Sequence, residues 1–134
     1  MSLTLPDGVK TLLDSAPHLI LATIQPDGSP QLSPVWGMRD GEEVLISTTV
    51  GRRKELNLRR DPRATVLVRP STYVYAEIRG TVTVSPDPEW RLVDELSRRY
   101  TGRPYAEFNP RSVHDAPRVV VRVSPRKIHT QGLG

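Results

Sequence analysis

Apolar positions near the start of the chain follow first a helical period and then a strand period. Val9, Leu12 and Leu13 recur at helical spacing, which predicts a short amphipathic helix over 6–16 that Pro17 ends. Three β-rich runs follow, separated by turns that contain Pro-Asp-Gly and Asp-Gly. The runs cover residues 18–24, 31–38 and 43–48. Their short connections predict a β-meander with one solvated face.

The later part of the chain alternates helical and strand patterns. Residues 50–60 form a loop that enters a helix, and the helix ends before Pro62 because the residue preceding a proline avoids the α region. A second amphipathic helix is expected at 89–100, with Trp90 and Leu96 in its apolar stripe. The remaining strands are expected at 63–69, 72–84 and 118–123, the last with an extension to 129.

Six strands with inserted helices and mostly short turns predict a mainly β fold, a small antiparallel barrel with flanking helices. The chain of 134 residues has the length of one ordinary domain, so we expect a single domain over 1–134. Hydrophobic residues make up 37% and aromatic residues 5%, which is enough for a modest core. Chains of this kind often bury more surface against a second copy, so a homodimer is expected.

Composition excludes several classes of chemistry. The chain has no cysteine, which removes disulfides, thiolate catalysis, thiolate zinc sites and iron–sulfur clusters. The first 24 residues lack the basic and apolar regions of a signal peptide, and no stretch approaches the ~20 apolar residues of a membrane span. We therefore expect a cytoplasmic protein without a membrane partner. The net charge of +4 favours an anionic ligand of some kind.

The segment 48–54, Thr-Thr-Val-Gly-Arg-Arg-Lys, has the parts of a phosphate-binding cradle. Hydroxyl groups end a strand, a glycine follows, and basic residues enter a helix whose first N–H groups lack partners. Arg52 can donate two hydrogen bonds to an anionic oxygen, and Lys54 adds a point charge. A solvated basic helix face would have the same composition, and spacing alone does not choose between the two.

Other residue types give no recognisable catalytic arrangement. His18, His114 and His129 lie far apart without metal-ligand spacing, so no metal site is expected. No paired carboxylates and no Gly-x-Ser-x-Gly motif are present, so no catalytic side chain can be assigned. Tyr73 and Tyr75 alternate along an expected strand and would share one face. That face would pack in a core or dimer contact, or stand beside a planar ligand.

Taken together, three stretches resemble the pyridoxamine-5'-phosphate-oxidase-like split-barrel family, and specifically its actinobacterial deazaflavin-dependent branch. They cover residues 21–36, 51–64 and 75–80. The resemblance implies a six-stranded antiparallel split β-barrel that forms a homodimer with two cofactor sites at the interface. The elements that bind pyridoxal phosphate in the true oxidases are not evident, so vitamin B6 oxidation is not expected.

The resemblance also implies roles for particular residues of this chain. The cofactor phosphate would be held by Ser47, Thr48, Thr49, Arg52 and Lys54, with Asn57 nearby and with Arg53 adding to the basic surplus. The ring system would lie against Gln31, Ser33, Pro34 and Val35, and less clearly Trp36. The second subunit would contribute Tyr73, Tyr75 and the region around His129.

The implied cofactor is coenzyme F420, a deazaflavin whose anionic polyglutamate tail suits the basic run 52–54. The implied activity is hydride transfer from the reduced deazaflavin to a small conjugated organic acceptor. The alternatives are a protein that binds flavin mononucleotide (FMN) or haem, a non-enzymatic cofactor carrier, and a nucleic-acid-binding module. Nucleic acid is disfavoured because 50–64 contains no aromatic stacking residue. The 101–117 stretch, with Tyr105, Phe108 and Pro110, would cover the site as a lid.

Overall fold

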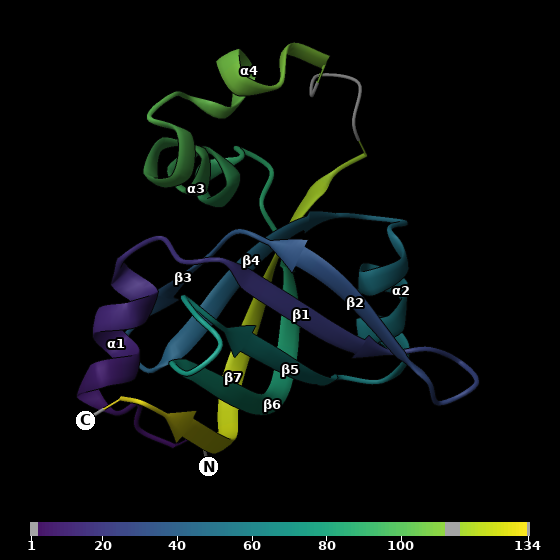
Figure 1. The fold of residues 1–134 in the computed structure, drawn as a ribbon. Coiled ribbons are helices and arrows are strands. Elements are labelled where there is room, and N and C mark those ends of the chain that lie inside the picture. The colour runs from purple at the N-terminus through teal and green to yellow at the C-terminus, as the bar shows by residue number, and fades with distance from the viewer. Residues whose placement is uncertain (1–2, 112–115, 134) are drawn as a thin grey trace.

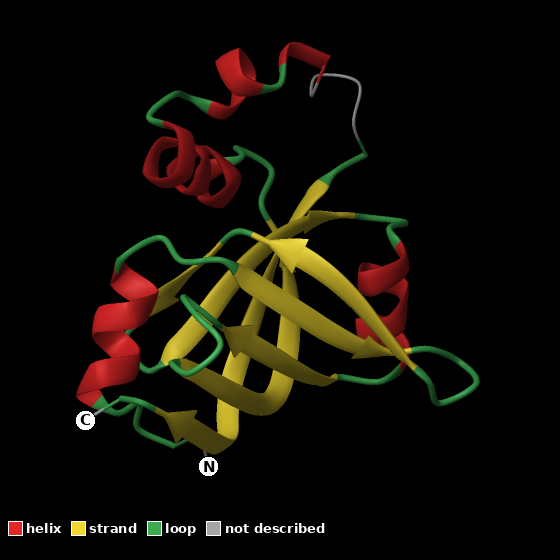
Figure 2. Ribbon diagram, viewed as in Figure 1, coloured by secondary structure: helices red, strands yellow, loops and turns green. Residues whose placement is uncertain are grey.

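The protein is a mainly β structure in which one antiparallel sheet curves into a barrel (Figures 1 and 2). The structure, a computed structural model, describes residues 3–111 and 116–133. The strand order in the sheet is β2-β1-β5-β6-β7-β4-β3, and every pair of neighbours is antiparallel. The strands are β1 Leu19–Ile24, β2 Pro30–Val35, β3 Gly37–Asp40, β4 Glu43–Thr49, β5 Arg63–Val68, β6 Tyr75–Pro86 and β7 Arg118–Gln131. The expectation of an antiparallel barrel is confirmed.

The two longest strands, β6 and β7, run through both halves of the barrel and bend at a bulge. Gly80 pairs with Pro125 while Arg79 pairs with Lys127, so Arg126 is the extra residue. A Cβ atom on Gly80 would lie 2.3 Å from the carbonyl oxygen of Ser124, so the close approach of the two backbones requires glycine. The bulge also accommodates Pro125, which cannot donate a ladder hydrogen bond.

The expected strand over 31–38 is divided into β2 and β3 at Trp36, which gives seven strands in place of six. The Tyr100 hydroxyl stabilises this corner, because it accepts the N–H of Gly37 at 3.2 Å and donates to the carbonyl of Pro17 at 2.8 Å. β2 and β3 stand at opposite ends of the strand order. The expected meander is therefore wrong: β1–β2 and β3–β4 are separate hairpins on two parts of the barrel.

Helices α1 (Asp7–Asp14) and α2 (Arg53–Arg60) lie on two sides of the barrel (Figure 1). α1 buries Val9 and Leu13 against the core, and α2 buries Leu58. The strands complete this core with alternating inward side chains, among them Leu21, Ile46, Val66, Ile78 and Val121. Contacts with the apolar interior thus hold both helices against the barrel, and α2 begins four residues after the end of β4.

Helices α3 (Arg91–Thr101) and α4 (Tyr105–Phe108) form an excursion between β6 and β7 that stands above the barrel (Figure 1). The carboxylate of Asp87 accepts the N–H groups of Arg91 and Leu92 at 3.0 Å, so α3 begins two residues later than the apolar stripe predicts. Leu92 and Leu96 pack on Met38 and Leu45 of the outer barrel surface.

Two further expectations change in the structure. Tyr73 precedes β6 and is 76% exposed, so Tyr73 and Tyr75 do not share a strand face as predicted. The final strand is longer than expected and continues through His129 to Gln131. His114 lies outside the described residues. Within the described part of the chain, no helix is long and apolar enough to cross a membrane.

Candidate functional site

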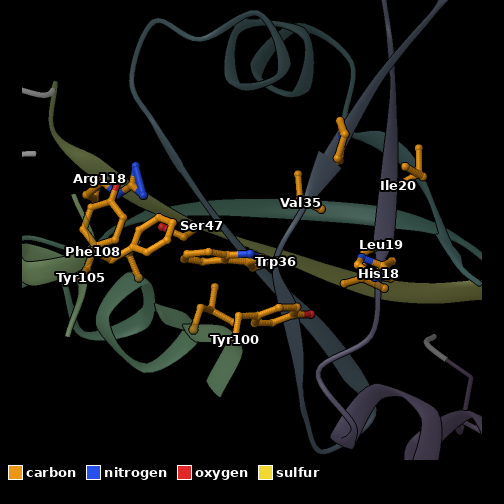
Figure 3. Close-up of a pocket in the computed structure, with 13 residues that line it drawn as sticks. His18, Leu19, Ile20, Val35, Trp36, Ser47, Tyr100, Tyr105, Phe108 and Arg118 are labelled. Atoms are coloured by element: carbon orange, nitrogen blue, oxygen red, sulfur yellow. The ribbon is translucent and has the colours of Figure 1, made fainter. Parts of the chain in front are cut away.

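A pocket of about 630 Å³ opens between the barrel and the α3–α4 excursion (Figure 3). This volume lies in the range of cofactor and substrate pockets. The barrel contributes His18, Leu19, Ile20, Pro34, Val35, Ser47 and Arg118. The corner at Trp36 and the excursion contribute Trp36, Val93, Leu96, Tyr100, Tyr105 and Phe108. The lining is mostly apolar, with a small number of polar groups.

Aromatic side chains form one wall of this pocket. The Trp36 indole stacks on the Tyr100 ring with centroids 5.4 Å apart and an angle of 16° between the planes. Phe108 meets the same indole edge-on at 5.2 Å. Tyr105 is buried and packs edge-on against Trp90 at 6.2 Å. The expected lid residues Tyr105 and Phe108 thus lie at the pocket, and α3 and α4 hold the aromatic wall in place.

Ser47 brings the end of β4 into the pocket. Leu45 and Ser47 face outward towards α3, whereas Val44, Ile46 and Thr48 alternate with them on the opposite face of the strand. The Ser47 hydroxyl oxygen is buried and has no hydrogen-bond partner among the described residues. A buried hydroxyl without a partner is costly, so this atom is suited to bind a ligand.

The basic run at the start of α2 lies next to the pocket. The ion pairs of residues 3–111 and 116–133 involve none of Arg52, Arg53 and Lys54. Arg52 and Arg53 are exposed, and Arg52 Nε is 3.4 Å from the Thr49 hydroxyl. Burial, and then the charges of Arg52 and Arg118, lower the pKa of Lys54 below its usual value. An anion that binds among such cations would reduce the repulsion between their positive charges.

The N–H groups at this helix end are only partly available. The Gly51 N–H donates to the Glu55 carboxylate at 2.9 Å, and the Arg52 N–H lies 3.3 Å from the carbonyl oxygen of Thr49. Glu55 is buried and also accepts Arg59 Nε at 2.7 Å. The side chains of Arg52 and Lys54, more than the helix dipole, would therefore attract an anion at this place.

Gln31, Ser33 and Asn57 belong to a polar network away from the pocket. Thr23 Oγ1 donates to Gln31 Oε1 at 2.9 Å and accepts Asn57 Nδ2 at 3.0 Å, and Gln31 Nε2 donates to Ser33 at 2.9 Å. Asn57 is fully buried, and its amide also reaches Gln25. The network joins α2 to β1 and β2. Of the four residues expected against the ring, the structure brings Pro34 and Val35 to the pocket wall.

Tyr73, Tyr75 and His129 lie at the other end of the molecule from the basic run. Thr49 pairs with Arg118 at the start of β7, whereas His129 lies eleven residues further along that strand, beyond the bulge. The rings of Tyr75 and His129 are 6.0 Å apart. His129 lines a second hollow of about 230 Å³ with Glu77, Arg79 and Lys127.

Sequence reasoning missed Arg118 as a pocket residue. Its guanidinium lies 5.0 Å from the centre of the Tyr105 ring, and its charge acts on Lys54. The signal in the sequence was weak, because Arg118 simply begins an expected strand directly after Pro117. Tyr100 was missed as well, because its place at the end of the expected helix 89–100 does not indicate the contact of its hydroxyl with Gly37. Among described residues, no group of three or more His, Asp or Glu could hold a metal ion.

The fold and site define a class of protein: an antiparallel barrel with an apolar pocket beside a basic loop. The chain belongs to the pyridoxamine 5'-phosphate oxidase family, whose model matches residues 5–132. This match confirms the family named from the sequence, and the solved structures with similar folds confirm the split-barrel fold.

The solved structures with similar folds belong to proteins with different descriptions. An F420 reductase is 33% identical, with a TM-score of 0.78, over 93% of this chain and 98% of that chain. A conserved hypothetical protein from Mycobacterium tuberculosis is 27% identical, with a TM-score of 0.77, over 97% and 86%. The haem storage protein HutZ from Vibrio cholerae is 15% identical, with a TM-score of 0.71, over 98% of both chains, and it shows the fold alone.

Proposed function

We propose that this chain is a coenzyme F420-dependent reductase that acts on a small conjugated organic acceptor. When bound, the reduced deazaflavin supplies the hydride. The similarity to an F420 reductase over nearly the whole chain supports this branch of the family over the others. FMN is the alternative cofactor, and haem binding or a carrier role without catalysis are the alternative functions.

The observation that carries the proposal is the juxtaposition of a basic run with an apolar pocket. Arg52 and Lys54 would hold the phosphate, with Arg53 extending the positive surface towards an anionic tail. Pro34, Val35 and Ser47 would contact the ring system, and the buried Ser47 hydroxyl would gain the partner that it lacks among described residues. The pocket walls would exclude water from the reacting atoms.

The site would be completed by a second copy of the chain. His129 near the end of β7, and Tyr73 and Tyr75 at the start of β6 beside it, lie at the opposite end of these strands from the basic run of their own chain. A homodimer that brings the His129 end of one subunit to the Lys54 end of the other would unite both halves. The second hollow, beside His129, offers polar side chains for such a contact.

The test is a titration of the purified protein with oxidised F420 and with FMN, followed by cofactor fluorescence. We expect F420 to bind more tightly than FMN, and Lys54→Ala to weaken F420 binding by about 10- to 100-fold, the loss of one hydrogen bond to a charged group. Lys10→Ala is the matched control, because Lys10 belongs to α1, on another side of the barrel from α2, and forms an ion pair with Glu42.

Each other outcome points to a different function. Tight FMN binding without F420 binding would assign the chain to the flavin branch. A Soret band on addition of haem, with neither flavin bound, would support haem binding. Failure to bind any of the three would contradict the proposal that this pocket holds a cofactor.

A further inference from the structure

We propose that the aromatic side of the pocket binds a planar, conjugated carboxylate, with Arg118 as the residue that recognises the carboxylate group. This ligand would be the acceptor of the reductase, so the assignment of its role rests on the proposed function. The evidence for the binding site is the pocket alone, and its charged residue, Arg118, lies outside the Arg52–Lys54 run that would hold the cofactor phosphate.

The shape and lining of the pocket favour a flat, apolar ligand. Trp36 and Tyr100 are stacked, which fixes the indole plane, and Phe108 closes the wall from the side while remaining 42% exposed. An exposed phenyl ring beside an indole gains contact area when a planar ring enters. In Figure 3, Phe108, Tyr105 and Arg118 lie on one side of Trp36, and Val35 and Ile20 lie on the other.

Arg118 supplies the charge that selects the functional group. Among the described residues that line the pocket, it is the one with a permanent positive charge. Its guanidinium lies over the Tyr105 ring at 5.0 Å, which orients the planar group at the pocket edge. A guanidinium can donate two parallel hydrogen bonds to the two oxygens of a carboxylate. These hydrogen bonds are stronger beside apolar walls than in water.

Arg118 also lies near the basic run, because it is the strand partner of Thr49 and its charge acts on Lys54. The anionic oxygen that Arg118 binds could therefore belong to the acceptor or to the cofactor phosphate. The position of Arg118 among aromatic side chains favours the acceptor. Ser47 lies between the two regions and can hydrogen-bond to either ligand. The experiment therefore compares matched ligands that differ in one charged group.

The first measurement uses a Trp90→Phe background, in which Trp36 is the single tryptophan. Trans-cinnamate and trans-cinnamamide share a ring and a conjugated double bond but differ in charge. We expect cinnamate to quench Trp36 fluorescence and to bind about ten-fold or more tightly than the amide. Phe108→Ala should weaken both ligands alike. Equal affinities for the acid and the amide would overturn the proposal.

Variants of Arg118 test whether this residue causes the preference for cinnamate over cinnamamide. Arg118→Gln should abolish the advantage of cinnamate while leaving cinnamamide affinity unchanged, which also shows that the pocket is still folded. Arg118→Lys should retain part of the advantage. A full preference for cinnamate in Arg118→Gln would contradict the assignment.

A second pair of ligands separates the two sources of the anion. FMN and riboflavin differ in one phosphate group, and we expect Arg118→Gln to leave their affinity ratio unchanged and Lys54→Ala to reduce it. Loss of the FMN preference in Arg118→Gln, with the cinnamate preference intact, would make Arg118 a phosphate ligand and overturn the proposal. Cinnamate binding by a protein that binds no flavin or deazaflavin would retain the carboxylate site and reject the reductase.

Discussion

Lys54 carries its charge in a half-buried position near two other cations. Burial and the charges of Arg52 and Arg118 all disfavour its protonated form, so its pKa falls below the usual value of 10.5. The folded protein therefore gives up this proton at a lower pH than the unfolded chain does. Folding stability should rise with pH between the lowered pKa and the unfolded value, because the unfolded state binds more protons there.

If Lys54 holds the cofactor phosphate as proposed, its lowered pKa would make anion binding dependent on pH. We expect affinity for FMN or F420 to fall as pH rises through the lowered pKa of Lys54, because only the protonated amine attracts phosphate. Lys54→Arg should keep its charge and lose this dependence, since arginine stays protonated. Fluorescence titrations across alkaline pH would measure both proteins. Parallel pH profiles would show that another group controls binding.

At the scale of elements, the β6–β7 pair determines the shape of the barrel. Its bulge lets two long strands bend, and Gly80 is the residue at which their backbones come closest. The position of the bulge also determines where His129 lies relative to the Arg118 end of β7.

Gly80→Ala should therefore destabilise the protein by about 1–3 kcal/mol or more, because its Cβ would meet the backbone oxygen of Ser124. Gly8→Ala is the control: an added Cβ in α1 meets only ordinary contacts, and stability should stay the same or rise by up to about 1 kcal/mol. Chemical denaturation would give both values. Equal stability of Gly80→Ala and the wild type would contradict the close approach.

Local sequence patterns predicted the helices and strands better than the corners between them. The Asp-Gly turn at 27–28 predicted the β1–β2 hairpin, and alternation predicted the strands. The break at Trp36 depends on the Tyr100 hydroxyl, 63 residues away from Gly37, and no local pattern reports such a contact. The basic run and Pro34 were predicted for the site, whereas Arg118 became a pocket residue only through the excursion that packs Tyr105 against it.

At the scale of the whole molecule, the two halves of the predicted cofactor site lie at opposite ends of β7. The basic run and apolar pocket occupy one end, and Tyr75 and His129 occupy the other. A dimer with two-fold symmetry would bring each end to its counterpart twice and form two equal sites. In such a dimer, one F420 molecule would contact both subunits.

Complementation between two variants tests this central claim most directly. Lys54→Ala and the double variant Tyr75→Ala, His129→Ala should each bind F420 weakly. Mixed dimers formed by unfolding and refolding them together should recover tight binding at about a quarter of the sites, because half of the dimers are mixed and each has one intact site. Fluorescence titration with F420 would count the recovered sites. If both variants fold and mixed dimers form but tight F420 binding does not return, the result would contradict a shared F420 site.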